Sequence, residues 1–347
     1  MSSGAELLWV GGYSAEMDGT ATGIRVLRRL AEGRLDDLGV AAPSTSPSFL
    51  ARSGETLYAA GESGASVSAF AVAGSRLDPL GIRDAAGPAP CSLAVIDDLL
   101  ITASYGDGAV GVHRLDSRRV PGPVVQVIPG QRVSGGVAPG PREAQDGPHA
   151  HDVLSYDRGT VLTTDLGTDS VHVLARRADG LTRVATVAVP AGSGPRDLWR
   201  HPSGAVWVLA ELSCELIVLV PADGTFTVVG RVPLPGAAAG DHAAGIAVDA
   251  LGRFAYIGLR GSNRVSVLRV PRSDDAHAAA PAAVASVARG GDGPRHLVVA
   301  AGVLYVANQL SNGVASFRLR DDGIPELLCS TAVPSPTFLL PGGLDEG

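Results

Sequence analysis

The sequence predicts an all-β protein: a seven-bladed β-propeller closed by pairing of its N- and C-terminal strands. First, a short strand-like run ending in a polar turn recurs about every 40 to 60 residues, a spacing typical of propeller blades. Second, the chain has 45 glycines and 24 prolines, which suit a β protein crowded with turns. The runs occur seven times, at residues 7–10, 56–59, 99–102, 161–164, 206–209, 254–257 and 303–306.

A second strand-like segment precedes every run except the first, and most of these segments begin with proline. Proline suits the first position of a strand, because its missing N–H breaks no ladder bond there. The six segments are residues 47–50, 90–93, 148–151, 195–198, 243–246 and 294–297. A third strand with alternating character follows the run, most clearly at residues 67–70, 171–174, 265–268 and 314–317. Fourth strands are less regular, as expected at the rim of a blade.

The two ends of the chain predict how the ring closes. The first repeat lacks a leading strand, whereas residues 336–340 resemble a leading strand with no repeat after it. We therefore expect the C-terminal strand to complete the N-terminal blade, which removes an exposed sheet edge. Six complete leads and one split lead give seven blades.

One closed repeat array can hold all 347 residues, so we expect a single domain over residues 1–347. Two segments lengthen the repeats and are interpreted as insertions: a Gly- and Pro-rich one near 117–147 and an alanine-rich one near 274–288. Long loops on a rigid scaffold often cover a binding face. The first insertion is therefore either a lid or filler.

Composition excludes several classes of function. The net charge of −7 argues against a nucleic-acid surface. No stretch reaches the roughly 18 apolar residues that cross a bilayer, and the start lacks a signal-peptide profile, so we expect a cytoplasmic protein without membrane contact. The three cysteines form no metal-ligand pattern, and we expect neither a metal nor another cofactor. The sequence gives no indication of a partner protein.

The chain has no lysine, so all 28 of its lysine-or-arginine residues are arginine. Schiff-base chemistry on a lysine is therefore excluded. Arginine binds carboxylates and phosphates through a forked pair of donors, which suits a small anionic ligand. A codon bias toward arginine would give the same composition.

Two sets of equivalent positions converge on the channel when the repeats are superposed. A glutamate, a histidine and three arginines among them could abstract a proton from water and stabilise an oxyanion. The alternative is that they form ion pairs that only fill the channel. The first set lies after the leading proline: Ser48, Cys91, His151, Arg196, Ala244 and Arg295. The second lies five residues before the third strand: Glu62, Tyr105, Leu166, Glu211, Arg260 and Gln309.

Several motifs resemble the seven-bladed 6-phosphogluconolactonase family of bacteria, to which the fungal carboxymuconate lactonizing enzymes look related. The resemblance covers nearly the whole chain, with two departures: Ala144 stands where the family has arginine, and Gly245 where many relatives have glutamate. The motifs are Gln145-Asp-Gly-Pro-His-Ala-His151, Asp165-Leu-Gly-Thr-Asp169, Gly194-Pro-Arg196, Glu211-Leu-Ser213, Leu259-Arg-Gly261 and Gly293-Pro-Arg295 with Ala307-Asn-Gln309.

The resemblance implies a lactonase that hydrolyses a sugar lactone, with 6-phospho-D-glucono-1,5-lactone as the leading substrate. Water would attack the ring carbonyl without a metal, with either Glu211 or His151 as general base. Arg196 and Arg260 would stabilise the oxyanion. Arg295 would hold the phosphate, and the further substrate-binding candidates are His149, Gln309 and Asp165.

Three other readings are compatible with the motifs. A cyclase would run lactone chemistry on an unsaturated dicarboxylate, with the arginines on its carboxylates. A calcium-dependent lactonase of the six-bladed kind would use carboxylate ligands, but seven repeats argue against it. An inactive propeller would serve as an interaction scaffold and should expose an apolar patch.

Overall fold

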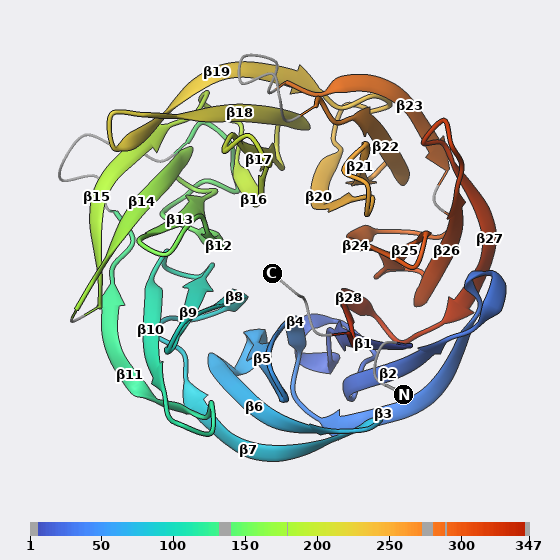
Figure 1. Cartoon of the computed structure of the whole chain (residues 1–347), viewed down its shortest axis with the longest axis horizontal. Coiled ribbons are helices and arrows are strands. Elements are labelled where there is room, and N and C mark those ends of the chain that lie inside the picture. Colours follow the sequence, from blue (N-terminus) through green and yellow to red (C-terminus); the bar gives the residue numbers. More distant parts are fainter. Residues whose placement is uncertain (1–5, 132–139, 179, 273–279, 289, 344–347) are drawn as a thin grey trace.

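A computed structural model describes residues 6–131, 140–178, 180–272, 280–288 and 290–343. These residues form seven four-stranded antiparallel sheets arranged around a central axis (Figure 1). The predicted seven-bladed β-propeller is thereby confirmed. Among the described residues, no helix is long and apolar enough to span a bilayer. Three single-turn 3₁₀ helices also occur in this part of the chain: η1 (Ala15–Met17), η2 (Ala31–Gly33) and η3 (Glu62–Gly64).

The inner strand of each blade lines the channel. In blade order these strands are β28 (Pro336–Pro341), β4 (Pro47–Ser53), β8 (Pro90–Ile96), β12 (Ala150–Ser155), β16 (Pro195–Arg200), β20 (His242–Val248) and β24 (Pro294–Ala300). The second strands are β1 (Leu7–Gly12), β5 (Thr56–Gly61), β9 (Leu99–Ser104), β13 (Thr160–Asp165), β17 (Val206–Ala210), β21 (Phe254–Arg260) and β25 (Val303–Asn308). The leading segments and recurrent runs of the sequence are thus the first and second strands.

The third and fourth strands complete each blade toward the rim. The third strands are β2 (Gly23–Arg29), β6 (Ser66–Ala73), β10 (Val110–Leu115), β14 (Ser170–Arg177), β18 (Glu215–Ala222), β22 (Arg264–Arg269) and β26 (Gly313–Leu319). The outer strands are β3 (Leu35–Pro43), β7 (Arg76–Asp84), β11 (Pro121–Ile128), β15 (Gly180–Ala188), β19 (Thr225–Pro233), β23 (Ala282–Ala288) and β27 (Pro325–Ala332).

The second strands form the driest layer because neighbouring blades cover both of their faces. Every residue of β5 and of β9 is buried. Such strands read as continuous apolar runs rather than alternating ones. Their large side chains fill the space between blades, and Trp9 and Trp207 are fully buried.

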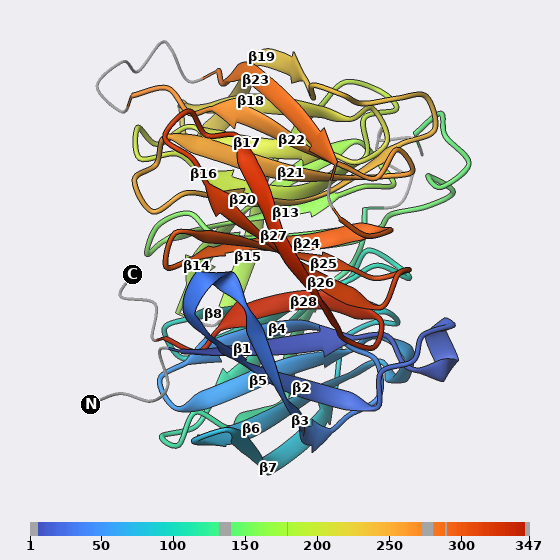
Figure 2. The ribbon, with the colours of Figure 1, turned by 90° about the vertical axis from the view of Figure 1, so that its right-hand side faces the viewer.

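The ring closes as the sequence predicts. Strand β28 pairs with β1 in antiparallel register, with Leu340 opposite Trp9 and Phe338 opposite Gly11. The two strands lie side by side in one sheet although they come from opposite ends of the chain (Figures 1 and 2).

Parts of both segments interpreted as insertions are regular outer strands. Strand β11 lies within 117–147 and β23 within 274–288. Residues 132–139 and 273–279 lie outside the described residues, so the choice between lid and filler stays open. The sequence does not predict strand β11, because its two prolines and its glycine look like a loop. In the structure its residues alternate in exposure, as expected for a strand at the rim.

Candidate active site

Each inner strand carries a β-bulge at an equivalent place in its register, where one extra residue stands without a ladder partner; in β12 the shift spans His151 and Asp152, and His151 occupies the equivalent place. A bulge re-aims a side chain out of the regular alternation. All seven extra residues line one axial cavity of about 140 Å³. They are Thr337, Ser48, Cys91, His151, Arg196, Gly245 and Arg295.

These residues are the first predicted set with one correction and one addition. Ala244 is paired with Gly258 in the ladder, and the extra residue of that blade is Gly245. The sixth blade therefore adds no side chain beyond a hydrogen here, in a left-handed backbone conformation with φ of 63°. Thr337 is the seventh member, supplied by the strand that closes the ring.

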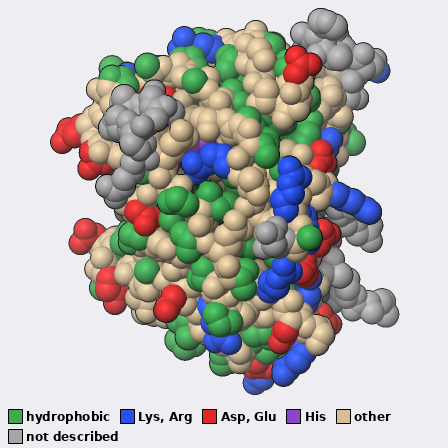
Figure 3. All heavy atoms as spheres, turned by 90° about the vertical axis from the view of Figure 1, so that its left-hand side faces the viewer, with side chains coloured by type: hydrophobic (Ala, Val, Ile, Leu, Met, Phe, Trp, Pro, Cys, Tyr) green, Lys and Arg blue, Asp and Glu red, His purple; other side chains and the backbone are tan. Residues whose placement is uncertain are grey.

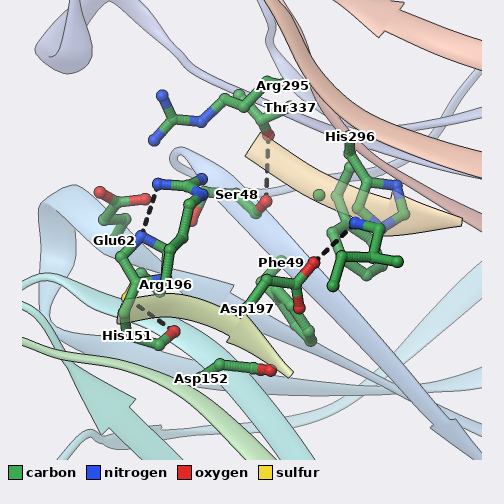
Figure 4. A pocket seen from close by; sticks show the side chains of 14 residues that line it. Ser48, Phe49, Glu62, His151, Asp152, Arg196, Asp197, Arg295, His296 and Thr337 are labelled. Atoms are coloured by element: carbon green, nitrogen blue, oxygen red, sulfur yellow. Dashed lines mark hydrogen bonds between the residues drawn. The ribbon is translucent and has the colours of Figure 1, made fainter. Parts of the chain in front are cut away.

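Charged groups divide the cavity into two ends. Arg196, Arg295, Glu62 and His151 lie together at one end, as Figure 4 shows. Asp152 and Asp197 lie farther along the inner strands, one residue after the bulge positions of their blades. Phe49 also lies at this second end, and its ring packs on that of Phe338 with centroids 4.1 Å apart.

The second predicted set lies where the second strands end. Glu62, Tyr105, Leu166, Glu211 and Gln309 each follow the last residue of a second strand, and Arg260 is the last residue of β21. Sequence reasoning missed the seventh member, Tyr13, although it directly follows Gly12 at the end of β1. The first repeat has no leading strand, which hid this equivalence.

Glu211 is the centre of an ion-pair cluster. Its Oε2 accepts from Arg196 Nη1 at 2.6 Å, and its Oε1 lies 2.7 Å from Arg260 Nη2. His242 Nδ1 lies 3.2 Å from the same Oε1. Burial would raise the pKa of Glu211, but the charges of Arg260 and Arg196 outweigh it and hold that pKa well below its usual range.

Arg196 joins Glu211 to His151. Its Nη1 lies 2.7 Å from His151 Nε2. A guanidinium only donates, so this imidazole nitrogen accepts and the ring is neutral. Burial, followed by the charge of Arg196, holds the pKa of His151 well below its usual range. The lone pair that a general base would use therefore points at a cation.

Arg295 belongs to a separate group at the same end of the cavity. Its Nη2 donates to the hydroxyl of Tyr13, whose ring centroid lies 4.8 Å from the guanidinium carbon. That hydroxyl donates to Glu62, with both carboxylate oxygens at 3.1 Å. Arg295 Nη1 donates to Gln309 Oε1 at 3.3 Å. Gln309 therefore lies beside Arg295, its substrate-binding role stays a prediction, and Glu62 puts a negative charge close to that arginine.

His149 and Asp165 lie outside the residues that line the cavity. Asp165 is buried and accepts the backbone N–H groups of His149, Gly167 and Thr168 at 2.8, 3.1 and 3.1 Å. His149 stacks on Tyr105 at 4.4 Å and contacts Asp146 through Nε2 at 2.8 Å. These contacts hold the loops that lead into β12, and the substrate-binding roles of both residues stay predictions.

Sequence reasoning also missed two neighbouring carboxyl groups, those of buried Asp152 and half-buried Asp197. Asp152 accepts from Ser92 Oγ at 2.8 Å and from the backbone N–H of Leu198 at 3.0 Å. Asp197 accepts the backbone N–H of Ile246 at 2.8 Å. Burial and the neighbouring Asp197 raise the pKa of Asp152 to about 8. The two acids connect the inner strands of four consecutive blades.

A second, larger hollow opens beside the axial cavity. It has a volume of about 430 Å³, within the range of small-molecule sites, and four of its lining residues are Glu211, His242, Arg260 and Gln309. The contacts Arg196–Glu211 and Arg295–Gln309 join the walls of the two spaces. Of the four predicted catalytic residues, Arg196 and Arg260 both contact Glu211, and His151 contacts Arg196.

Residues 7–341 match the family described as "Lactonase, 7-bladed beta-propeller". The chain belongs to this family. A candidate 6-phosphogluconolactonase from Bacteroides fragilis has a crystal structure with a TM-score of 0.87 and 26% identity, covering 98% of this chain and 99% of that one. The periplasmic gluconolactonase PpgL of Pseudomonas aeruginosa has a TM-score of 0.86 and 26% identity, over 96% and 98% of the two chains.

The curated relatives of this lactonase-family chain are uncharacterized proteins. One from Staphylococcus saprophyticus is 30% identical over 175 residues, so the match spans only 50% of its length and 49% of this chain. YwcC of Lactococcus lactis is 26% identical over 276 residues, which is 76% of this chain and 78% of YwcC. The family of this chain is thus shown, whereas these relatives do not identify its substrate.

Proposed function

We propose that this protein hydrolyses a sugar lactone to its open hydroxy acid, with 6-phospho-D-glucono-1,5-lactone as the first candidate and 6-phosphogluconate as its product. The cluster of Arg196, Glu211 and Arg260 carries the proposal, because two guanidinium groups contact one carboxylate at the wall of an open hollow. The named functions of the Bacteroides and Pseudomonas proteins support the same substrate class.

The two arginines supply the electrostatics that ring opening needs. Attack of water on the lactone carbonyl creates an oxyanion, which preorganised donors stabilise. Arg196 is buried, and Arg260 keeps its charge at neutral pH although burial lowers its pKa to about 10. Glu211 holds both guanidinium groups in place.

Arg295 is the proposed contact for a substrate phosphate. Two of its five N–H donors are used by Tyr13 and Gln309, which leaves donors for an anion. Glu62 opposes this role because its carboxylate shares the Tyr13 hydroxyl with Arg295. The balance between the two decides whether the phosphorylated or the unphosphorylated sugar lactone is preferred.

The scaffold alternative lacks support in the described residues. Their exposed large apolar side chains are spread around the rim, as with Val40, Ile82, Val184, Val229 and Leu327 on five different outer strands. On the face in Figure 3, hydrophobic side chains lie among charged ones rather than gathering in one patch. The seven blades also do not fit the six-bladed calcium-dependent reading.

Acid release in a pH-stat, corrected for spontaneous hydrolysis, tests the proposal. The panel is D-glucono-1,5-lactone, its 6-phosphate and an unsaturated dicarboxylate, each with and without a chelator. We expect turnover of a sugar lactone that survives the chelator and falls by about 10²- to 10³-fold in Arg196→Ala, the usual effect of losing one oxyanion donor. Arg231→Ala, which removes a half-exposed partner of Glu215, is the matched control.

Two results would contradict the proposal. Lactone hydrolysis no faster than in buffer would remove the hydrolase assignment. Turnover of the dicarboxylate alone would favour the cyclase, in which the same arginines bind substrate carboxylates.

A further inference from the structure

Glu211 and His151, the two general bases that the sequence predicts, are both poor proton acceptors in this structure. Both oxygens of Glu211 are engaged by guanidinium groups, and its pKa is held well below the usual range. A carboxylate of such low basicity is a weak proton acceptor at neutral pH. His151 is neutral, but its accepting nitrogen faces Arg196 at 2.7 Å.

A third candidate, His242, faces the open hollow and was not among the predicted residues. Its Nδ1 lies 3.2 Å from Glu211 Oε1, and its side chain is 47% exposed. The charged side chains that line the hollow with it are Glu211 and Arg260. The structure therefore places an imidazole on solvent-accessible space, beside a buried carboxylate and a guanidinium.

The Glu211 contact fixes the tautomer of His242. An ionised carboxylate only accepts, so Nδ1 carries the hydrogen and the lone pair is on Nε2. A base that is hydrogen-bonded to an orienting carboxylate through its other nitrogen is a recurrent catalytic arrangement. Glu211 would then orient the base rather than be the base.

The backbone around His242 is held firmly, so the imidazole starts from a defined position. His242 is the first residue of β20 and pairs with Arg260 in the ladder. The preceding residue, Asp241, is buried and accepts from Ser262 Oγ at 2.6 Å and from the backbone N–H of Ala238 at 2.8 Å. A catalytic group on such a rigid element keeps its geometry through turnover.

We propose that His242 is the general base of the lactonase reaction, oriented by Glu211; this inference rests on the proposed function. His242 Nε2 takes a proton from water as the water oxygen bonds to the lactone carbonyl carbon. The resulting oxyanion is stabilised by Arg260, which lines the same hollow, and by the charge of Arg196, which Glu211 joins to Arg260. As the intermediate collapses, the bond from that carbon to the ring oxygen breaks, and the ring oxygen takes the proton from Nε2. One water and one lactone give one hydroxy acid.

His242→Asn is the decisive variant because its amide can still donate to Glu211 in place of Nδ1–H but has no group at the place of Nε2. We expect kcat to fall by about 10²- to 10³-fold, within the usual range for a lost general base, with KM changed less than about threefold. The part of the kcat/KM–pH profile that depends on a general base should disappear. Added imidazole should restore turnover in His242→Gly and leave the wild type unaffected.

Two further variants separate this role from a structural one. Leu310→Ala alters the wall of the same hollow and should keep the wild-type pH profile. His151→Gln keeps an acceptor for Arg196 and should also keep that profile, without any rescue by imidazole. Thermal unfolding of each variant checks that the fold is intact.

Each other outcome overturns a defined statement. If His242→Asn keeps more than a third of wild-type kcat, or keeps the pH profile, His242 is not the base. The same holds if kcat falls but imidazole fails to restore His242→Gly, because the loss then reflects the position of Glu211. A wild type that hydrolyses no lactone in the panel overturns the proposed function, and the role of His242 with it.

Discussion

At the scale of single residues, the balance of buried charge decides what the site can bind. Two cations, Arg196 and Arg260, are matched by one carboxylate, Glu211. This ion-pair cluster therefore has an excess of positive charge. Arg295 is matched by Glu62 through the hydroxyl of Tyr13. Glu62 should therefore weaken the attraction between Arg295 and a phosphate group of the substrate.

Glu62→Gln tests this balance. The amide oxygen can still accept from Tyr13, but the negative charge beside Arg295 is gone. We expect affinity for 6-phosphogluconate to rise by about tenfold, equivalent to about 1.4 kcal/mol, with little change for gluconate. Titration calorimetry with both products measures this, and Glu55→Gln, in an exposed turn, is the matched control. Equal changes for the two products would show that Glu62 does not discriminate against phosphate.

Repeat register predicted the convergence of Arg196, Glu211 and Arg260 because equivalent positions face one axis in any closed ring of blades. It could not find His242, whose proposed role depends on a contact with Glu211 of the adjacent blade. Asp152 and Asp197 were not predicted for another reason. In a regular strand consecutive side chains point to opposite faces, whereas the bulges turn each of these residues and the one before it toward the cavity.

At the scale of elements, the bulges explain both the site and the links between blades. An extra residue in one strand leaves local backbone donors without ladder partners. Side chains of neighbouring inner strands satisfy several of them: Asp152 binds the N–H of Leu198, and Asp197 binds the N–H of Ile246. In the last blade, His296 Nδ1 accepts the N–H of Leu339 at 3.2 Å. The same irregularity thus aims functional side chains inward and joins adjacent blades.

Asp152→Asn should change how stability depends on pH. In the folded state the pKa of Asp152 is raised to about 8, by burial first and then by Asp197. A raised carboxyl pKa gives stability that is complete below the unfolded value near 4 and is lost as pH rises toward 8. The variant stays neutral, so its free energy of unfolding should fall less between pH 5 and 9.

Urea unfolding at several pH values measures this difference. We expect it to be at least about 1 kcal/mol, since one unit of pKa shift corresponds to about 1.4 kcal/mol. Asp223→Asn makes the same charge change in an exposed turn and should keep the wild-type slope. Parallel curves for Asp152→Asn and the wild type would mean that Asp152 is not protonated in the folded protein.

At the scale of the whole molecule, closure by β28 is the feature that the sequence predicted most directly. The first repeat lacks a leading strand, and the last segment of the sequence is a leading strand without a repeat. The outer strands were less accessible to prediction. Strands β11 and β23 are paired on one side only and are rich in proline, glycine or alanine, so tertiary packing rather than local preference defines them.

Removing β28 should therefore destabilise the entire ring. A chain of residues 1–335 exposes the edge of β1 and loses Phe338 and Leu339 from two hydrophobic clusters. We expect cooperative thermal unfolding, followed by tryptophan fluorescence, to be lost or to shift down by roughly 10 °C or more, since a few kcal/mol moves a domain by several degrees.

A circular permutant separates loss of closure from loss of chain. Residues 336–343 joined through a short Gly/Ser linker to residues 6–335 would restore β28 as a hairpin with β1, because the Gly342 N–H already donates to the Leu7 carbonyl at 2.8 Å. This permutant should unfold as cooperatively as the wild type. If the truncated chain matched both, the seven blades would be held by packing between neighbours alone, and the shared blade would contribute nothing to the stability of the ring.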